Sequence, residues 1–185
     1  YPITGWSITN TIAATRRGDA FAVYQTAPLQ SITFVHNTGY TQAGAGFRNN
    51  DMNVDPISVR AAGNVFYGGT DTTCAVWVRG NNDRFRNDSC LVYSVTGQTS
   101  MARGENKSCG VATGGFRWGD PLFADTSFAT LDLRLRTGSP GLSALYPSGY
   151  AGAFQYASDA TPSAVVSDLV ATQAGNGLGR LTLTA

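Results

Sequence analysis

An all-β repeat fold, a β-solenoid, is the fold class that this sequence predicts, and a regular spacing of asparagines is the first reason. Asn10, Asn37 and Asn64 recur every 27 residues, each within a short stretch of extended character. A fixed period of about 20 to 50 residues is typical of repeat architectures, and a spacing of 27 suits one coil of a β-solenoid. With coils about 4.8 Å apart, the asparagines are expected to stack into a ladder of side-chain amide hydrogen bonds.

Apolar positions around the asparagines repeat with the same period and are the second reason. Ile8, Val35 and Ala62 each stand two residues before an asparagine. Further on in each period comes a second run that is typical of a strand, at 20–24, 43–47 and 74–78. The sequence therefore predicts two strands and an asparagine-bearing turn in every coil.

The composition indicates one turn-rich β domain. The chain has 22 glycines, 7 prolines and only 14% charged residues, and the best helical candidate is a short segment at 162–171. The net charge of +1 excludes a general nucleic-acid binder, because that role needs a concentrated basic face. No apolar stretch is long enough to span a membrane.

Four motifs late in the chain resemble the closing segment of secreted right-handed parallel β-helix proteins, the pectate-lyase-like superfamily. They are GDPLFAD at 119–125, LDLRL at 131–135, GSPGLSA at 138–144 and YAGAFQY at 150–156. Two departures fall at turn positions: Ser143 replaces the family's usual Asp, and Tyr150-Ala151 replaces Asp-Ile. The resemblance implies a right-handed parallel β-helix over 1–156, an irregular C-terminal extension over 157–185, and an extracellular, cell-surface or periplasmic location.

This fold is shared by polysaccharide lyases, glycoside hydrolases and non-catalytic scaffolds, so it does not choose an activity. A lyase of this family, by resemblance, uses Lys or Arg as base beside a uronate and often Asp-bound Ca²⁺. Arg79, Arg84 and Arg86 are interleaved with polar residues and suit an anionic sugar, or else form a solvated turn. The segment 51–55 resembles an oxygen-rich cation loop but lacks the further acidic ligands of a Ca²⁺ site, so no metal or cofactor is predicted.

Other catalytic arrangements are poorly supported by the sequence. A glycoside hydrolase needs two carboxylates about 5 to 9.5 Å apart. Nearby pairs exist at Asp51 with Asp55 and at Asp83 with Asp88, where turn formation is the favoured interpretation. His36 is the single histidine, so this chain alone cannot build a multi-histidine metal site.

Aromatic and cysteine residues supply the remaining candidates. Tyr40 and Tyr67 each follow an asparagine by three residues and are expected to face outward as a pair that a sugar ring stacks on. In a secreted protein, two of three cysteines are expected to pair. A Cys90–Cys109 bond would close the long loop between them, whereas a Cys74–Cys90 bond would link neighbouring coils.

Two functions from different classes follow. The favoured one is a secreted or surface-exposed, non-catalytic scaffold that contacts a polysaccharide or a protein as one component of a larger assembly. The alternative is the C-terminal part of a polysaccharide lyase or glycoside hydrolase whose catalytic coils lie upstream. Because Tyr1 falls in the middle of an expected coil, another chain or upstream coils are expected to cover that end, and the tail at 157–185 is expected to dock on a protein surface.

Overall fold

The regular structure of the protein consists of β-strands. The computed structural model describes residues 5–23, 31–49, 58–70, 75–78, 85–95, 101–103, 116–143, 146, 149–153, 168–173 and 179–184. Within these ranges the strands form five sheets, three of them parallel, and there is no helix. Accordingly, no helix of the described part could cross a membrane. The prediction of an all-β protein with parallel strands is confirmed.

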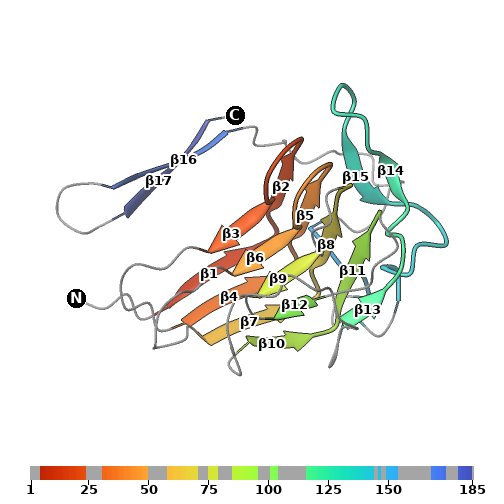
Figure 1. The fold of residues 1–185 in the computed structure, drawn as a ribbon, viewed down its shortest axis with the longest axis horizontal. Coiled ribbons are helices and arrows are strands. Elements are labelled where there is room, and N and C mark those ends of the chain that lie inside the picture. The colour runs from red at the N-terminus through yellow and green to blue at the C-terminus, as the bar shows by residue number, and fades with distance from the viewer. Residues whose placement is uncertain are drawn as a thin grey trace.

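The three parallel sheets are ordered like the chain itself (Figure 1). The first sheet contains β1 (Trp6–Thr9), β4 (Ser31–Val35), β7 (Ser58–Ala62) and β10 (Phe85–Asp88). The second contains β2 (Ile12–Thr15), β5 (Thr38–Thr41), β8 (Val65–Gly68), β11 (Cys90–Ser94) and β13 (Phe116–Trp118). The third contains β3 (Phe21–Val23), β6 (Phe47–Asn49), β9 (Val76–Val78) and β12 (Met101–Arg103).

The chain visits the three sheets in turn and then starts again one strand further along each sheet. Thr9 pairs with Val35, and Val35 pairs with Ala62, so equivalent positions in the first sheet are 26 or 27 residues apart. Each repeat therefore has three strands, where the sequence predicted two. The first two strands of a repeat were missed as separate elements because only two residues, such as His36 and Asn37, lie between them.

Aromatic rings from all three sheets fill the space between them. Phe34 of the first sheet packs edge-on against Phe21 and Phe47 of the third, with ring centroids 5.8 and 5.1 Å apart. Phe47 in turn lies 5.3 Å from Phe66 of the second sheet. These side chains are buried together with branched residues such as Val59, so one continuous apolar core joins the sheets.

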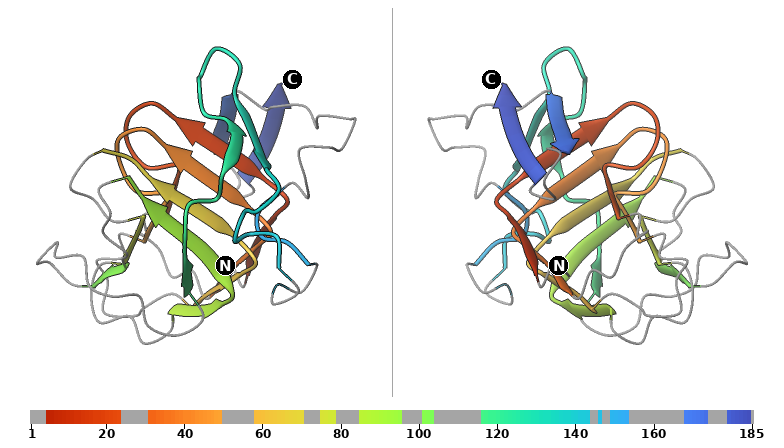
Figure 2. Two further views of the ribbon diagram at one scale, coloured as in Figure 1. Left: turned by 90° about the vertical axis from the view of Figure 1, so that its right-hand side faces the viewer. Right: turned by 90° about the vertical axis from the view of Figure 1, so that its left-hand side faces the viewer.

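The outer face of the second sheet is covered by the closing part of the chain. Strands β14 (Phe123–Asp125) and β15 (Asp132–Leu135) form an antiparallel hairpin that crosses this face (Figure 2). A second apolar cluster lies between them and includes Phe123, Leu133 and Leu135 from the hairpin. The closing motifs identified in the sequence therefore build a lid over one sheet.

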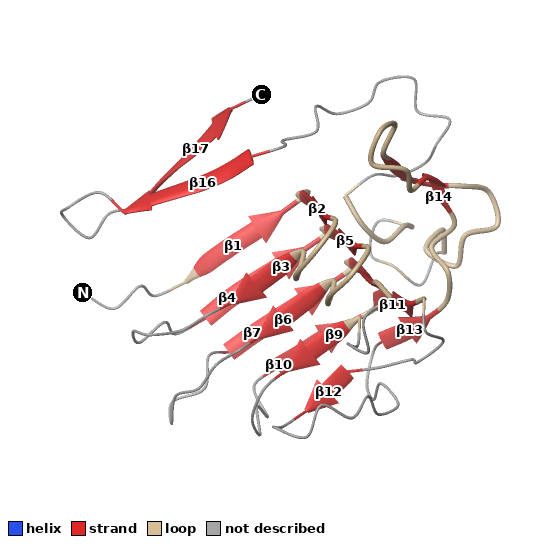
Figure 3. Cartoon of the chain, turned by 45° about the horizontal axis from the view of Figure 1, so that its top comes forward, coloured by secondary structure: helices blue, strands red, loops and turns tan. Residues whose placement is uncertain are grey.

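A further antiparallel hairpin consists of β16 (Asp168–Gln173) and β17 (Gly179–Thr184). The segment 162–171 was the best helical candidate, yet its described part belongs to strand β16, because pairing with β17 overrides a weak local preference. Figures 1 and 3 both show this hairpin on the side of β1, away from β10. The predicted domain boundary after residue 156 lies outside the described residues.

Candidate functional site

A left-handed residue marks the turn between the first and second sheets in every repeat. The residues are Asn10, His36, Gly63 and Ser89, with φ angles of 51°, 53°, 61° and 58°. This backbone region favours Gly and tolerates Asn better than most residues, because a Cβ atom crowds the following carbonyl. The stacked turns explain why small or polar residues recur at these positions.

Directly after these turns a buried polar ladder runs across the stack. The Asn37 side chain donates to Asn64 Oδ1 at 3.0 Å and to the Ile8 carbonyl at 2.8 Å, and its Oδ1 accepts from the Thr11 amide at 2.9 Å. Asn64 Oδ1 also accepts from the Asn37 amide at 2.8 Å, and its amide group donates to the Phe34 carbonyl at 3.0 Å. The asparagines thus hold the turns of neighbouring repeats together.

The structure brings Asn37 and Asn64 together but places Asn10 one position earlier, at the left-handed turn residue. Thr11 occupies the ladder position of the first repeat, and Cys90 that of the fourth. Thr11 and Asn37 are 26 residues apart, whereas Asn37 and Asn64 are 27 apart. Counting 27 residues back from Asn37 therefore gives Asn10, one residue before the ladder position.

Cys90 closes the ladder as a buried free thiol. Asn64 Nδ2 donates to Cys90 Sγ at 3.3 Å, and burial raises the pKa of this thiol to about 12. A thiol with this pKa is protonated at neutral pH and unreactive. Both predicted disulfides would use Cys90, which is a free thiol in the structure, and their partners Cys74 and Cys109 lie outside the described residues.

The outer face of the second sheet carries a row of aromatic rings. Tyr40 and Tyr67 are paired in register and have ring centroids 4.9 Å apart, and Tyr93 continues the row 5.3 Å further on. Tyr40 is only 3% exposed, because Phe123 and Phe128 of the closing segment lie against it. Its hydroxyl donates to the Thr126 carbonyl at 3.2 Å.

The structure therefore differs from the expectation of an open tyrosine pair. The two rings do lie together on the outer face, but the β14–β15 hairpin covers Tyr40 and half-buries Tyr67. Burial is the main cause that raises the pKa of the Tyr67 hydroxyl, with smaller contributions from Tyr40 and Asp120. The Tyr67 hydroxyl is therefore not placed to ionise near neutral pH.

The ring beside the open end of this row is Trp118 of β13, a residue that the sequence did not indicate, and its Cα partner is Val92, the residue before Tyr93. The Trp118 ring is 5.9 Å from the Tyr93 ring at an interplanar angle of 32°, and its side chain is half exposed at 50%. Arg117 and Asp120 are exposed on either side of it in the chain. Tyr93 follows Tyr67 by one period, so the repeat would have revealed it, whereas nothing periodic points to Trp118.

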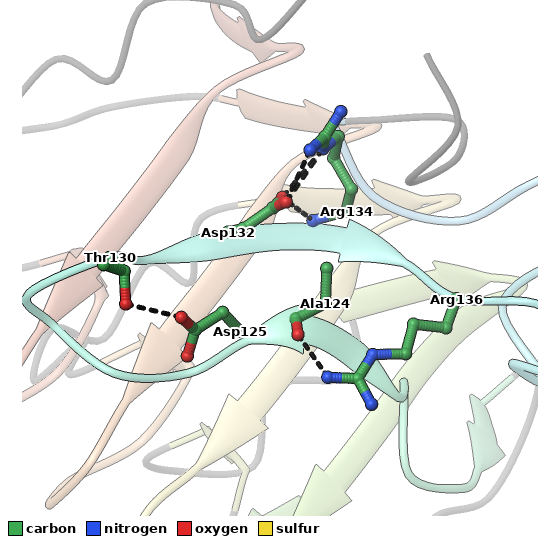
Figure 4. A network of polar contacts seen from close by, with 6 residues as sticks. All are labelled: Ala124, Asp125, Thr130, Asp132, Arg134 and Arg136. Atoms are coloured by element: carbon green, nitrogen blue, oxygen red, sulfur yellow. Dashed lines mark hydrogen bonds and ion pairs between the residues drawn. The ribbon is translucent and has the colours of Figure 1, made fainter. Parts of the chain in front are cut away.

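The β14–β15 hairpin is braced by a network of polar contacts (Figure 4). Arg134 donates from Nε to Asp132 Oδ1 at 2.8 Å and from a terminal nitrogen to Oδ2 at 2.6 Å, which lowers the pKa of Asp132. Thr130 donates to Asp125 at 2.5 Å and lowers the pKa of that carboxyl, and Arg136 donates to the Ala124 carbonyl. These contacts stiffen the cover over the aromatic row.

The three predicted arginines are only partly described. Arg79 and Arg84 lie outside the described residues, and Arg86 is placed in β10 by its backbone, where its Cα partner is Arg60. The Arg60 guanidinium lies 3.2 Å from the Asp88 carboxylate, and both side chains are exposed. Solvent screening makes such an exposed pair weak.

A charged and aromatic cluster centred on Arg48 lies at the third sheet, and the sequence did not indicate it. Arg48 Nε lies 2.8 Å from Asp19 Oδ2, and the guanidinium stacks 4.1 Å from the Trp77 ring centroid. The contact between Arg48 Nε and Asp19 does not have the geometry of a hydrogen bond, so it is an ion pair. Because Asp19 neutralises Arg48 and also accepts from the Ala45 amide at 2.9 Å, the cluster braces the loop before β6.

His36 joins the turn of its repeat to the end of the closing segment. Its ring lies 5.4 Å from the Tyr150 ring, and burial lowers the pKa of the imidazole. The Gly152 amide donates to the Gly63 carbonyl at 2.7 Å, and a Cβ on Gly63 would lie 2.9 Å from the His36 ring. The sequence departure at Tyr150 thus supplies the ring that packs on His36.

The candidate metal ligands and carboxylate pairs do not form a metal site within the described ranges. No group of three His, Cys, Asp or Glu side chains there is close enough to hold a metal ion together. Asp51, Asp55 and Asp83 of the candidate carboxylate pairs lie outside the described residues, and Asp88 faces Arg60. The open end of the aromatic row is the best-defined candidate for a binding site.

Comparison with known proteins yields no relative: the chain matches no protein-family model, no curated protein and no solved structure. The resemblance to parallel β-helix proteins therefore rests on the closing motifs and on the arrangement of the strands.

Proposed function

We propose that this chain is a right-handed parallel β-helix that acts as a non-catalytic binding scaffold outside the cytoplasm. It contacts carbohydrate through the open end of the aromatic row, Trp118 and Tyr93. The extracellular, cell-surface or periplasmic location follows from the resemblance of the closing motifs. The exposed stacked indole of Trp118 is the observation that carries the proposal.

The order of the strands supports the β-helix. Successive strands of each parallel sheet come from successive repeats, and in the first sheet paired residues are 26 or 27 positions apart. The buried Asn37–Asn64 contact joins equivalent turns of successive repeats, as expected of stacked coils. A regular stack of this kind holds outward side chains in rows with fixed spacing.

A rigid, half-exposed aromatic ring is suited to the C–H face of a sugar. The Trp118 ring packs against the Tyr93 ring, which is itself backed by Tyr67, so this contact helps to position the indole before a ligand arrives. Preorganisation of this kind lowers the entropy cost of binding. Asp120 is exposed two residues after Trp118 and is a hydrogen-bond acceptor available to hydroxyl groups.

The test compares two tryptophans of equal exposure at opposite ends of the stack. Trp118 and Trp6 are exposed to 50% and 51%, but only Trp118 belongs to the row. Hexasaccharides of glucose, mannose, xylose and galacturonate are titrated by calorimetry into the wild type, Trp118→Ala and Trp6→Ala. At least one sugar is expected to bind the wild type and Trp6→Ala equally, and Trp118→Ala at least tenfold more weakly.

Tyr93→Ala is a second variant for the same site, because it removes the ring behind Trp118 and is expected to weaken binding less. Circular dichroism of each variant shows whether the β structure is intact. Equal binding by Trp118→Ala and the wild type, or no binding of any of the four sugars, would refute the carbohydrate site.

A further inference from the structure

One end of the stack presents three strand edges. Strands β1, β2 and β3 each pair with a single neighbour, β4, β5 and β6, and among the described strands none lies on their other side. Such edges offer rows of backbone donors and acceptors that pair readily with other strands. Proteins normally cover or blunt them.

The same end exposes part of the apolar interior. Trp6 pairs with Ile32, and Ile32 pairs with Val59, so the three residues form one row on the inner face of the first sheet. Ile32 and Val59 are 4% and 0% exposed, but Trp6 is 51% exposed. The difference arises because no described strand lies beyond β1, so the inner face of the first repeat lacks a cover.

The β16–β17 hairpin has one apolar face. Its register pairs Leu169 with Leu183 and Ala171 with Leu181, so these four apolar positions share one face of the ribbon. The alternate positions, which include Thr182 and Arg180, share the other face. A lone two-stranded hairpin is marginally stable in water, and a cover on its apolar face is what stabilises it.

The tether between the two parts is long enough for them to meet within one chain. The Ala153 amide donates to Thr38 Oγ1 at 3.0 Å, which anchors the closing segment on β5, next to the edge strand β2. The 14 residues at 154–167 reach up to about 46 Å when extended, against a strand spacing of about 4.8 Å. Figures 1 and 3 both draw the hairpin on the β1 side of the stack.

We propose that the β16–β17 hairpin caps the β1–β2–β3 end of its own chain, with its apolar face over Trp6 and the partly buried Ile8. Attachment in the same chain gives a high effective concentration, which favours this contact over one between chains. The inference stands apart from the carbohydrate site, which lies on β11 and β13.

Hydrogen exchange of the full-length protein tests the cap. Three proteins are compared: the wild type, Leu183→Asp on the apolar face, and Thr182→Asp on the other face as the matched control. The β1 amides, at Trp6–Thr9, are expected to exchange at least tenfold faster in Leu183→Asp than in the other two. Amides of β8 are expected to be equally protected in all three.

Each other outcome overturns the inference. Rapid exchange of β1 in the wild type would mean that the end is open, and equal protection in all three proteins would mean that something else covers it. Protection that rises with protein concentration, together with a dimer mass in light scattering, would assign the cap to a second copy of the chain. The β8 amides separate these outcomes from general unfolding.

Discussion

Replacing Asn64 by Ala tests the polar ladder and its register together. Asn64 is fully buried and accepts from the Asn37 amide at 2.8 Å and from the Asn37 side chain at 3.0 Å. Alanine leaves the Asn37 amide without its acceptor, which costs about 1 to 3 kcal/mol, and the two further lost bonds, to the Asn37 side chain and to the Phe34 carbonyl, cost about 1 kcal/mol each. The expected loss of unfolding free energy is therefore about 3 to 5 kcal/mol.

Asn10→Gly is the matched control, since the 27-residue spacing and the structure disagree about Asn10. At a φ of 51° glycine fits without strain, and Asn10 lies outside the ladder, so the free energy of unfolding is expected to change by less than about 1 kcal/mol. A ladder role for Asn10 would instead make this substitution as costly as Asn64→Ala.

Urea unfolding, followed by both tryptophan emission and far-ultraviolet circular dichroism, measures the two variants. The two signals must coincide before a free energy is taken, because repeat proteins do not always unfold in one step. A loss below about 1 kcal/mol for Asn64→Ala, or equal losses for both variants, would refute the ladder described above.

Three further outcomes are expected. Burial lowers the pKa of His36, so its contribution to stability is fully present above its unfolded pKa near 6.5 and is lost as the pH falls below that value. Urea unfolding midpoints at pH 7.5 and 5.5 measure this loss of stability. A His36→Asn variant should lose less stability between the two pH values. Cys90, with a pKa near 12, is expected to resist iodoacetamide at pH 8 until urea is added, as peptide mapping would reveal, and rapid labelling of the folded protein would contradict its burial. Gly152→Ala places a Cβ 2.7 Å from Thr38 Oγ1 at a φ of 90°, and it is expected to lower the free energy of unfolding by about 2 to 3 kcal/mol in the same urea assay. Gly149→Ala, at a φ of 75° with open space around it, should lower it by about 1 kcal/mol. Equal costs would count against the packing of the closing segment.

The sequence by itself determined the class of the fold. The 27-residue spacing of Asn37 and Asn64 predicted stacked strands, and these two side chains are in contact in the structure. A period is visible because each repeat meets the same local requirements: a left-handed turn residue, a buried polar residue and alternating apolar positions. The period did not fix the register of Asn10, since a repeat that changes by one residue shifts a position out of the ladder without changing the pattern of strands.

Only the tertiary structure decided which outward residues are open. The expected pair, Tyr40 and Tyr67, lies under the β14–β15 hairpin, and the contact of Tyr40 with Thr126 joins residues 86 positions apart. Such a contact depends on how a distant segment packs back on the sheet, which no local period records. Phe123 of the hairpin packs on the Tyr40 and Tyr67 rings, whereas Trp118, beside the end of the row, stays half exposed. Periodicity sets the pairing of neighbouring strands, whereas long-range packing sets which of their faces meet solvent.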